Sequence, residues 1–307
     1  MEKLKVKIAD FAKAVSVSAS PILISGETGS GKSLIARYIY ERSERCNDSF
    51  TVIPLSELPQ ELFESQLFGH KKGSFTHALD SFSGLLEAAN NGTVVLEEID
   101  CLPIYMQPKI LRLIESGEYQ SIGYTQVKKC SIRFIATVNK NLKTLVDEKL
   151  FRNDLYYRLN VLNFEMLPLR QRVGDLQLMI EHFSDCFARL YRRPRLNFTT
   201  DALNALLAYQ WPGNIRELKA EIERVYVFTR KSATEISIGD LSADIIDLDI
   251  SMAAEELLNE VNTADTARQK QNILDALNRN RWNKSQAARE LGISRKHLYE
   301  LMGQHNI

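Results

Sequence analysis

The segment GETGSGKS at residues 26–33 has the residue types and spacing that bind the phosphates of a nucleotide. It fits the pattern G-x-x-x-x-G-K-[ST] at every fixed position, after an apolar run at 21–25 and before a helical pattern at 33–45. Its glycines let backbone N–H groups turn toward a phosphate, and the start of the helix adds a partial positive charge. We expect Lys32 to contact the β- and γ-phosphates of a bound nucleotide and the Ser33 hydroxyl to bind Mg²⁺. The other predicted cradle residues are Gly26, Glu27, Thr28, Gly29, Ser30 and Gly31.

Two adjacent carboxylates follow a second apolar run, TVVL, at residues 93–96. A nucleoside triphosphatase needs acidic groups beside the metal and the attacking water. We expect Glu98 to orient or polarise that water and Glu97 to hold the hydration shell of the metal. The metal-side residue in such sites is usually Asp, and Glu is one methylene longer, which matters because Mg²⁺ requires near-octahedral geometry.

The composition is that of a globular protein with an uneven distribution of charge. The chain has 307 residues, a net charge of zero and 44% apolar residues, which excludes wholesale disorder and fibrous repeats. Its apolar runs are too short to span a bilayer, its first residues do not form a secretory signal, and its four cysteines form no C-x-x-C pair. We therefore expect a cytoplasmic protein with no membrane partner. Residues 235–265 contain nine acidic and no basic residues, whereas 266–307 have a net charge of +5, which predicts a tether and a polyanion-binding module.

The apolar patterns predict two folded regions before this tether. Strand-like runs at 21–25, 49–55, 92–98 and 131–139 alternate with helical patterns, which is typical of an α/β fold with a parallel sheet. After Pro168 the patterns predict only helices, at 175–190, 200–209 and 215–229. The predicted domains are an α/β domain at 1–167, an all-helical unit at 168–238, an acidic linker at 239–265 and a terminal helical domain at 266–307.

The last residues have the spacing of a helix-turn-helix, with predicted helices at 284–291 and 295–304 around the turn residue Gly292. Asn283 and Gln286 resemble a capping box at the start of the first helix. The early residues of the second helix reach DNA in this motif, whereas we expect Tyr299 to lie in the core. The predicted contacts to bases or phosphates are Ser294, Arg295, Lys296 and His297.

Taken together, the motifs resemble one family. They are GETGSGKS, ESQLFGHKKGSFTHA, GTVVLEEID, FRNDLYYRLNVL, LPLRQR and WPGNIREL. In this order they resemble the AAA+ ATPase of bacterial enhancer-binding proteins, the NtrC-type activators of sigma-54 RNA polymerase. The terminal helices resemble the Fis-type helix-turn-helix of the same regulators. The resemblance implies an AAA+ P-loop parallel sheet with a helical lid, and a C-terminal all-α domain. It also implies three partners: double-stranded DNA, the sigma-54 polymerase holoenzyme, and other copies of the chain, from a dimer to a hexameric ring. Because no receiver motif precedes the ATPase, we expect a member that lacks a receiver domain.

The resemblance also assigns roles to individual residues. Arg152 and Arg158 match the arginine fingers that reach into the nucleotide site of the next subunit. Asn139 matches the sensor of the γ-phosphate, and Arg216 matches the second sensor, on the lid. The loop that contacts sigma-54 in this family corresponds to Gly73, Ser74, Phe75, Thr76, His77 and Ala78.

Three positions depart from the family pattern. His77 replaces a glycine at the tip of the loop, where backbone freedom is expected to matter. Pro54 stands where the family has an Asn that restrains the catalytic Glu, and Glu97 replaces the usual Asp. These changes leave two interpretations open: a divergent but working activator, or a module for nucleotide-regulated assembly with slow hydrolysis and altered polymerase contact. A DNA-binding regulator that acts without sigma-54, its AAA+ module serving oligomerisation, is a rival hypothesis. A remodeller of another protein is a third.

Overall fold

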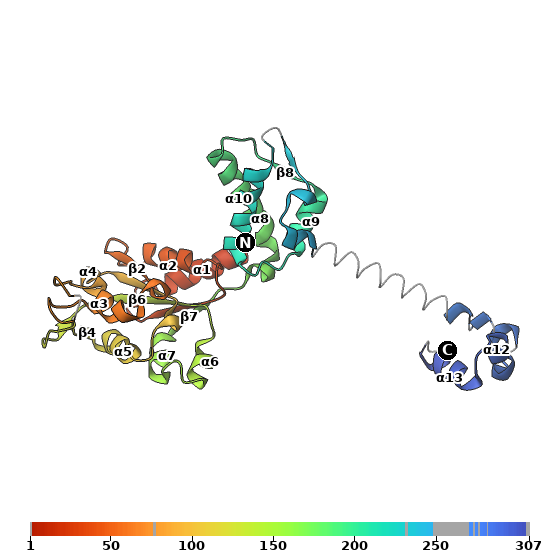
Figure 1. Ribbon diagram of the computed structural model, residues 1–307, viewed down its shortest axis with the longest axis horizontal. Helices are drawn as coiled ribbons and strands as arrows, with labels where there is room; N and C mark the ends of the chain where they lie inside the picture. The colour runs from red at the N-terminus through yellow and green to blue at the C-terminus, as the bar shows by residue number, and fades with distance from the viewer. Residues whose placement is uncertain are drawn as a thin grey trace. The chain divides into compact units, whose positions relative to one another are not determined.

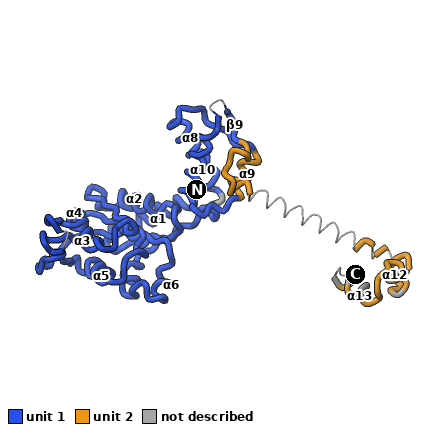
Figure 2. Tube along the Cα trace, in the orientation of Figure 1, with its two compact units in different colours: residues 1–199, 209–236 blue, residues 200–208, 237–307 orange. Residues whose placement is uncertain are grey.

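The computed structural model describes residues 2–75, 78–230, 233–247, 270–272, 274–275, 277–280 and 282–304. The chain divides into two compact units, shown in different colours in Figure 2. The first comprises residues 1–199 and 209–236, and the second comprises residues 200–208 and 237–307. Each unit is described here by itself.

The first unit is built on a five-stranded sheet with the strand order β2-β3-β6-β1-β7, in which every neighbouring pair is parallel. Its strands are β1 (Ile22–Ser25), β2 (Phe50–Pro54), β3 (Thr93–Glu97), β6 (Arg133–Val138) and β7 (Leu162–Glu165). The predicted parallel α/β fold is confirmed, and four of the strands fall within the predicted runs. The edge strand β7 was not predicted, because its four residues, LNFE, are too few to show a period of two and only Phe164 among them is buried.

Helices cover both faces of the sheet (Figure 1). Strand residues alternate between the faces, so Ile22 and Ile24 contribute to one apolar cluster and Leu23 to the other. The helices of this region are α1 (Glu2–Ala14), α2 (Lys32–Glu41), α3 (Phe63–Phe68), α4 (Leu85–Ala88), α5 (Gln107–Ser116), α6 (Leu142–Asp147) and α7 (Asn153–Leu159). Short 3₁₀ helices connect several of them, at η1 (Leu55–Glu57), η2 (Gln60–Leu62) and η3 (Ile99–Cys101).

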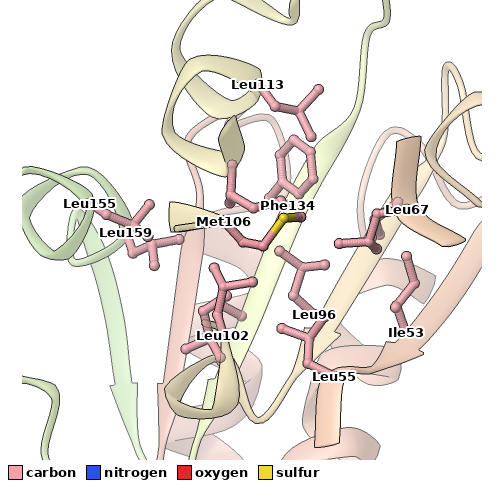
Figure 3. Close-up of a cluster of buried hydrophobic side chains, with 14 of the residues drawn as sticks. Ile53, Leu55, Leu67, Leu96, Leu102, Met106, Leu113, Phe134, Leu155 and Leu159 are labelled. Carbon is pink, nitrogen blue, oxygen red and sulfur yellow. The ribbon is translucent and has the colours of Figure 1, made fainter. Parts of the chain in front are cut away.

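The larger apolar cluster fixes the carboxyl ends of β3 and β6. Figure 3 shows Leu96 of β3 and Phe134 of β6 beside Met106 and Leu113, which lie just before and within α5. Helix α5 has apolar side chains along one face and ends at Gly117. The Gly117 N–H donates to Leu113 O at 2.9 Å in a left-handed C-cap. Next to it, β4 (Glu118–Tyr119) and β5 (Lys128–Lys129) form an antiparallel pair.

The remainder of the first unit is mostly helical. Helix η4 (Leu169–Gln171) precedes α8 (Val173–Leu190), which packs against α10 (Asn214–Phe228). The prediction that this region is all-helical is wrong in one detail. Strands β8 (Asn197–Phe198) and β9 (Glu235–Ile236) form a parallel pair.

The second unit contains α9 (Thr200–Ala208), η5 (Ile238–Asp240), α12 (Lys284–Glu290) and α13 (Arg295–Gln304). Helices α12 and α13 pack together around the turn at Gly292, whose φ is 67°. Leu277 and Met302 are buried in this region. Most of the predicted acidic linker lies outside the described residues. Among the helices that the structure describes, none has the length and apolar character to cross a membrane.

Candidate nucleotide site

The phosphate-binding segment forms a tight loop between β1 and α2. Gly29 and Gly31 have φ angles of 75° and 102°, which glycine adopts without strain. A Cβ atom added at Gly29 would lie 2.2 Å from the backbone oxygen of Gly213, so a side chain there would displace the segment that leads into α10. The turn and the close approach both require glycine at this position.

Lys32 lies at the centre of the loop and is 8% exposed. Its Nζ donates hydrogen bonds to the backbone oxygens of Gly26 at 2.8 Å and Glu27 at 2.9 Å. A third bond, of 2.6 Å, reaches Oδ1 of Asn139 at the end of β6, a residue 107 positions away in sequence. Burial lowers the pKa of Lys32, and the carboxylates of Glu98 and Asp100 offset part of that effect. The structure thus brings the predicted γ-phosphate sensor to the predicted phosphate-binding lysine.

The predicted metal-side carboxylate Glu97 and the predicted catalytic carboxylate Glu98 lie at the end of β3, beside this lysine. The Ser33 hydroxyl donates a hydrogen bond to Oε1 of Glu97, so two hard oxygen ligands lie side by side, and this pair fits Mg²⁺. Glu98 has a left-handed backbone with φ 57°, and its N–H donates to Oγ1 of Thr137 at 3.2 Å. The sheet register places Pro54 directly opposite Glu97.

These groups open onto one cleft with a volume of about 330 Å³. Its lining comes from the phosphate loop, from the ends of β3 and β6, and from α10. It comprises Thr28, Gly29, Gly31, Lys32, Ser33, Leu34, Glu97, Glu98, Thr137, Asn139, Ile215, Arg216 and Lys219. The Ser30 hydroxyl in the same loop is buried and has no hydrogen-bond partner among the described residues. The cleft therefore brings the phosphate-binding lysine, the carboxylates that end β3 and Asn139 together with the predicted lid arginine, Arg216. The predicted cradle residues Gly26, Glu27 and Ser30 do not line it.

A polar link between the loop and the lid was not predicted from sequence. Arg170 donates hydrogen bonds of 2.8 Å and 2.5 Å to the two carboxylate oxygens of Glu27. Asn214 is fully buried, and its Nδ2 donates to Oε2 of Glu27 at 3.1 Å and to the backbone oxygen of Thr28 at 3.0 Å. Its Oδ1 accepts from Leu169 N at 2.7 Å. Both residues stand in the motifs LPLRQR and WPGNIREL, but only the fold brings them to Glu27.

This link predicts a pH-dependent contribution to stability. The hydrogen bonds from Arg170, and then those from Asn214, lower the pKa of Glu27 from 4.5 to about 2. Because the folded pKa is depressed, the contribution is complete above the unfolded pKa of 4.5 and is lost as the pH falls toward 2. The Glu27 side chain is 40% exposed, so we expect at most about 1 kcal/mol.

The measurement compares thermal unfolding of the wild type with that of Glu27→Gln across this pH range. The difference in melting temperature should be constant above about pH 5.5 and shrink below the unfolded pKa. Glu61→Gln, at an exposed position, is the control and should show no such trend. A difference that persisted unchanged at acidic pH would contradict the assigned ionisation.

The two predicted arginine fingers lie at the start of α7 and in its last turn, and they do not line the cleft of their own chain. Arg152 precedes the helix, and its backbone N–H donates to Oε1 of the buried Gln107 at 2.7 Å. Its guanidinium forms a two-point ion pair with Asp154, at 3.1 Å and 2.7 Å. Arg158, in the last turn, is exposed, and within the described part of the chain no hydrogen bond or ion pair engages its side chain. The two arginines therefore differ in how freely they can reach a neighbouring subunit.

The predicted polymerase-contact loop is described at its base. Gly73 N donates to Ala78 O at 2.9 Å, and Ala78 N donates to Phe75 O at 3.0 Å. The Phe75 ring packs edge-on against the ring of His70, with a centroid distance of 4.9 Å. Ser74 is partly buried beside this turn. Thr76 and His77, the predicted loop tip, lie outside the described residues.

In the second unit, the predicted DNA contacts Ser294, Arg295 and Lys296 are exposed around the start of α13. The side chain of His297 lies outside the description. Gln286 N donates to Oδ1 of Asn283 at 3.3 Å, which is one half of the predicted capping box. The expectation that Tyr299 lies in the core is wrong, since this residue is 46% exposed.

Comparison with known families gives three consecutive matches. Residues 2–165 match the sigma-54 interaction domain, residues 170–253 match an AAA+ ATPase lid domain, and residues 267–305 match the Fis family of bacterial regulatory proteins.

Individual relatives agree with these matches. The chain is 39% identical to the regulatory protein AtoC of Escherichia coli over 97% of its own length and 65% of that protein. It is 37% identical to the response regulator PilR of Pseudomonas aeruginosa, over 96% of this chain and 65% of the relative. The chain thus spans slightly less than two thirds of these relatives. Among solved structures, NtrX from Brucella abortus in complex with ATP aligns with a TM-score of 0.73 and 27% identity, over 99% of this chain and 68% of that one.

Proposed function

This chain belongs to the NtrC-type, sigma-54-dependent transcription activators, and from that premise we propose that it hydrolyses ATP in a ring to remodel promoter-bound sigma-54 polymerase while bound to upstream DNA. The observation that carries the proposal is the cleft in which Lys32, Glu98, Asn139 and Arg216 converge. Its proposed partners are double-stranded DNA, the sigma-54 holoenzyme and further copies of the chain, from a dimer to a hexamer. We place this activity in the bacterial cytoplasm, where promoter DNA and polymerase are located.

The residues of the cleft have separate roles in the proposed hydrolysis of ATP. Lys32 and the N–H groups of the loop bind the phosphates, and Glu98 orients and polarises the attacking water. Ser33 and Glu97 would hold Mg²⁺, which neutralises charge on the β- and γ-phosphates. Arg216 reads the nucleotide from the lid, and an arginine from α7 of the next subunit stabilises the transferred phosphoryl group. The proposed active site is therefore complete only between subunits.

We infer slow turnover from two of the sequence departures. Pro54 has no backbone N–H and no amide side chain, and the register places it opposite Glu97 at the carboxyl edge of the sheet. The side chain that positions the catalytic Glu in the switch of this family is therefore missing from β2. Glu97, with its extra methylene, forms a hydrogen bond with the Ser33 hydroxyl, so the metal must compete for both oxygens.

The test of the proposed function is a pair of loop substitutions. Thr76→Ala should abolish ATP-dependent open-complex formation by sigma-54 polymerase without lowering the ATPase rate, because the loop contacts the polymerase rather than the nucleotide. His77→Gly should keep or raise activation, because glycine freely adopts backbone angles to which His has restricted access. Both activities are measured on purified protein with a sigma-54 promoter.

The same pair tests the alternative that His77 itself suggests. A bulky side chain at the loop tip favours a DNA-binding regulator whose AAA+ module serves oligomerisation and which acts independently of sigma-54. In that case neither substitution would alter regulation, although DNA binding and assembly would continue. Indifference to both changes would remove the sigma-54 assignment.

A further inference from the structure

Two cationic side chains from different helices converge on the exposed ring of Tyr299. Lys284, the first residue of α12, has its Nζ 4.7 Å from the ring centroid. Arg295, the first residue of α13, has its guanidinium carbon 5.8 Å from the same centroid. Both distances fall within the range of cation–π attraction. Two positively charged side chains therefore lie close to one exposed aromatic ring in the second unit.

Acidic side chains do not pair with this cluster in the described part of the chain. The structure records no ion pair between an acidic side chain and Lys284 or Arg295 among the residues that it describes. Glu290, the last residue of α12, is engaged elsewhere, since it accepts from Arg279 at 2.8 Å and forms a hydrogen bond with Asn280. The hydrogen bond from Arg295, followed by the charge of Lys284, lowers the pKa of the Tyr299 hydroxyl. The site is thus a small concentration of positive charge that also contains a hydroxyl donor.

We propose that Lys284, Arg295 and Tyr299 together bind one phosphodiester of the DNA backbone. This assignment rests on the proposed DNA-binding function and makes it more specific. A phosphate carries a full negative charge and several acceptor oxygens, so it can satisfy two cations and a hydroxyl at once, whereas a base edge accepts one bidentate donor.

The position of the three residues also favours the backbone. In a helix-turn-helix the first helix crosses the phosphate backbone while the second enters the major groove. Lys284 lies on the first helix and Arg295 on the second, so the cluster joins both elements at the point where α13 begins. Arg295, placed over the Tyr299 ring, acts as a phosphate contact that sets the register of the protein on DNA rather than as a reader of sequence.

The experiment measures binding of the full-length protein to two kinds of short duplex DNA: a random-sequence pool, and sites enriched from that pool by the wild type. Affinity is determined by fluorescence anisotropy over a salt range of about 50 to 200 mM. The variants are Lys284→Ala, Arg295→Ala, Tyr299→Leu and Tyr299→Phe. The last two are a matched pair, because Phe keeps the aromatic face and Leu keeps only apolar bulk. Far-UV circular dichroism and thermal melting confirm that each variant is folded.

We expect each loss of a cation to reduce the slope of log K against log salt by about 1, equally on both DNAs. Tyr299→Leu should lower affinity about two- to fivefold on both DNAs, the equivalent of one exposed cation–π contact. Tyr299→Phe should retain most of the wild-type affinity.

Several results would overturn the phosphate site. One is that Arg295→Ala weakens only the enriched sites and leaves the salt slope unchanged, which would make Arg295 a base reader. Another is that Tyr299→Leu binds as tightly as the wild type. If Tyr299→Leu did not fold, the slopes of the two cation variants and the affinity of Tyr299→Phe would still decide the question. A wild type that binds no duplex at low salt would instead refute the DNA-binding function itself.

Discussion

Replacing Arg158 by alanine is expected to lower the ATPase rate by about 10³-fold or more while leaving ATP binding intact. An arginine supplied by a neighbouring subunit stabilises charge that develops only in the transition state, so its loss reduces kcat rather than affinity. Arg158 is exposed, and no ion pair holds it within the described residues. Arg152 is paired with Asp154 and must exchange that partner for a phosphate. We therefore expect Arg152→Ala to have the smaller effect on kcat.

Mixing two inactive variants tests whether the arginine acts between subunits. Lys32→Ala removes the phosphate lysine but keeps Arg158, whereas Arg158→Ala keeps a complete nucleotide cleft. In mixed rings, a Lys32→Ala subunit can supply its arginine to an intact cleft next to it. Part of the wild-type ATPase rate should then return. Light scattering checks that the mixed rings assemble. If mixed rings assemble but stay inactive, Arg158 does not act in trans.

The second large effect is expected from Lys32→Ala alone. Loss of a charged hydrogen-bond donor should weaken ATP binding by roughly 10- to 100-fold, and turnover should fall below detection. Lys32 Nζ also joins Gly26 O to Oδ1 of Asn139, so its removal separates the loop from the end of β6. Isothermal titration with ATP and a steady-state ATPase assay measure the two effects.

Lys140→Ala is the matched control for this substitution. Lys140 follows Asn139 directly but is exposed and does not line the nucleotide cleft. It should leave binding and turnover unchanged, and DNA binding should survive in both variants because the terminal domain is not altered. An ATPase rate of Lys32→Ala equal to that of the wild type would remove the proposed enzymatic activity.

The elements of the nucleotide cleft were predictable because each is a local pattern. The loop glycines, the apolar runs of β1, β3 and β6, and the carboxylates that end β3 are contiguous in sequence, and parallel strands bring their carboxyl ends together. Helix α13 was predicted with its exact bounds. Ser294 is a typical residue before the start of a helix, and the residues that follow it repeat apolar side chains at helical spacing, which together form a strong local signal.

The features that were not predicted are contacts between residues far apart in sequence and very short strands. Glu27 meets Arg170 and Asn214 across 143 and 187 positions, and no local pattern encodes such a contact. Strands β8 and β9 have two residues each, too few to show a period of two. Tyr299 was expected in the core, but its ring is 46% exposed and lies 4.7 Å from Nζ of Lys284 on α12, a contact between two helices that no local pattern encodes.

The hydrogen bonds between the lid and the phosphate loop have a consequence for regulation. Asn214 and Ile215, at the start of α10, donate to the backbone oxygens of Thr28 and Gly29 at 3.0 Å each. Any event that displaces α10 must therefore break bonds to the phosphate-binding loop and also move Arg216, which lines the nucleotide cleft. We therefore expect lid position and ATP affinity to be thermodynamically linked, and such linkage is reciprocal. A protein or DNA contact that draws the lid away is then expected to weaken ATP binding by the same factor by which ATP weakens that contact.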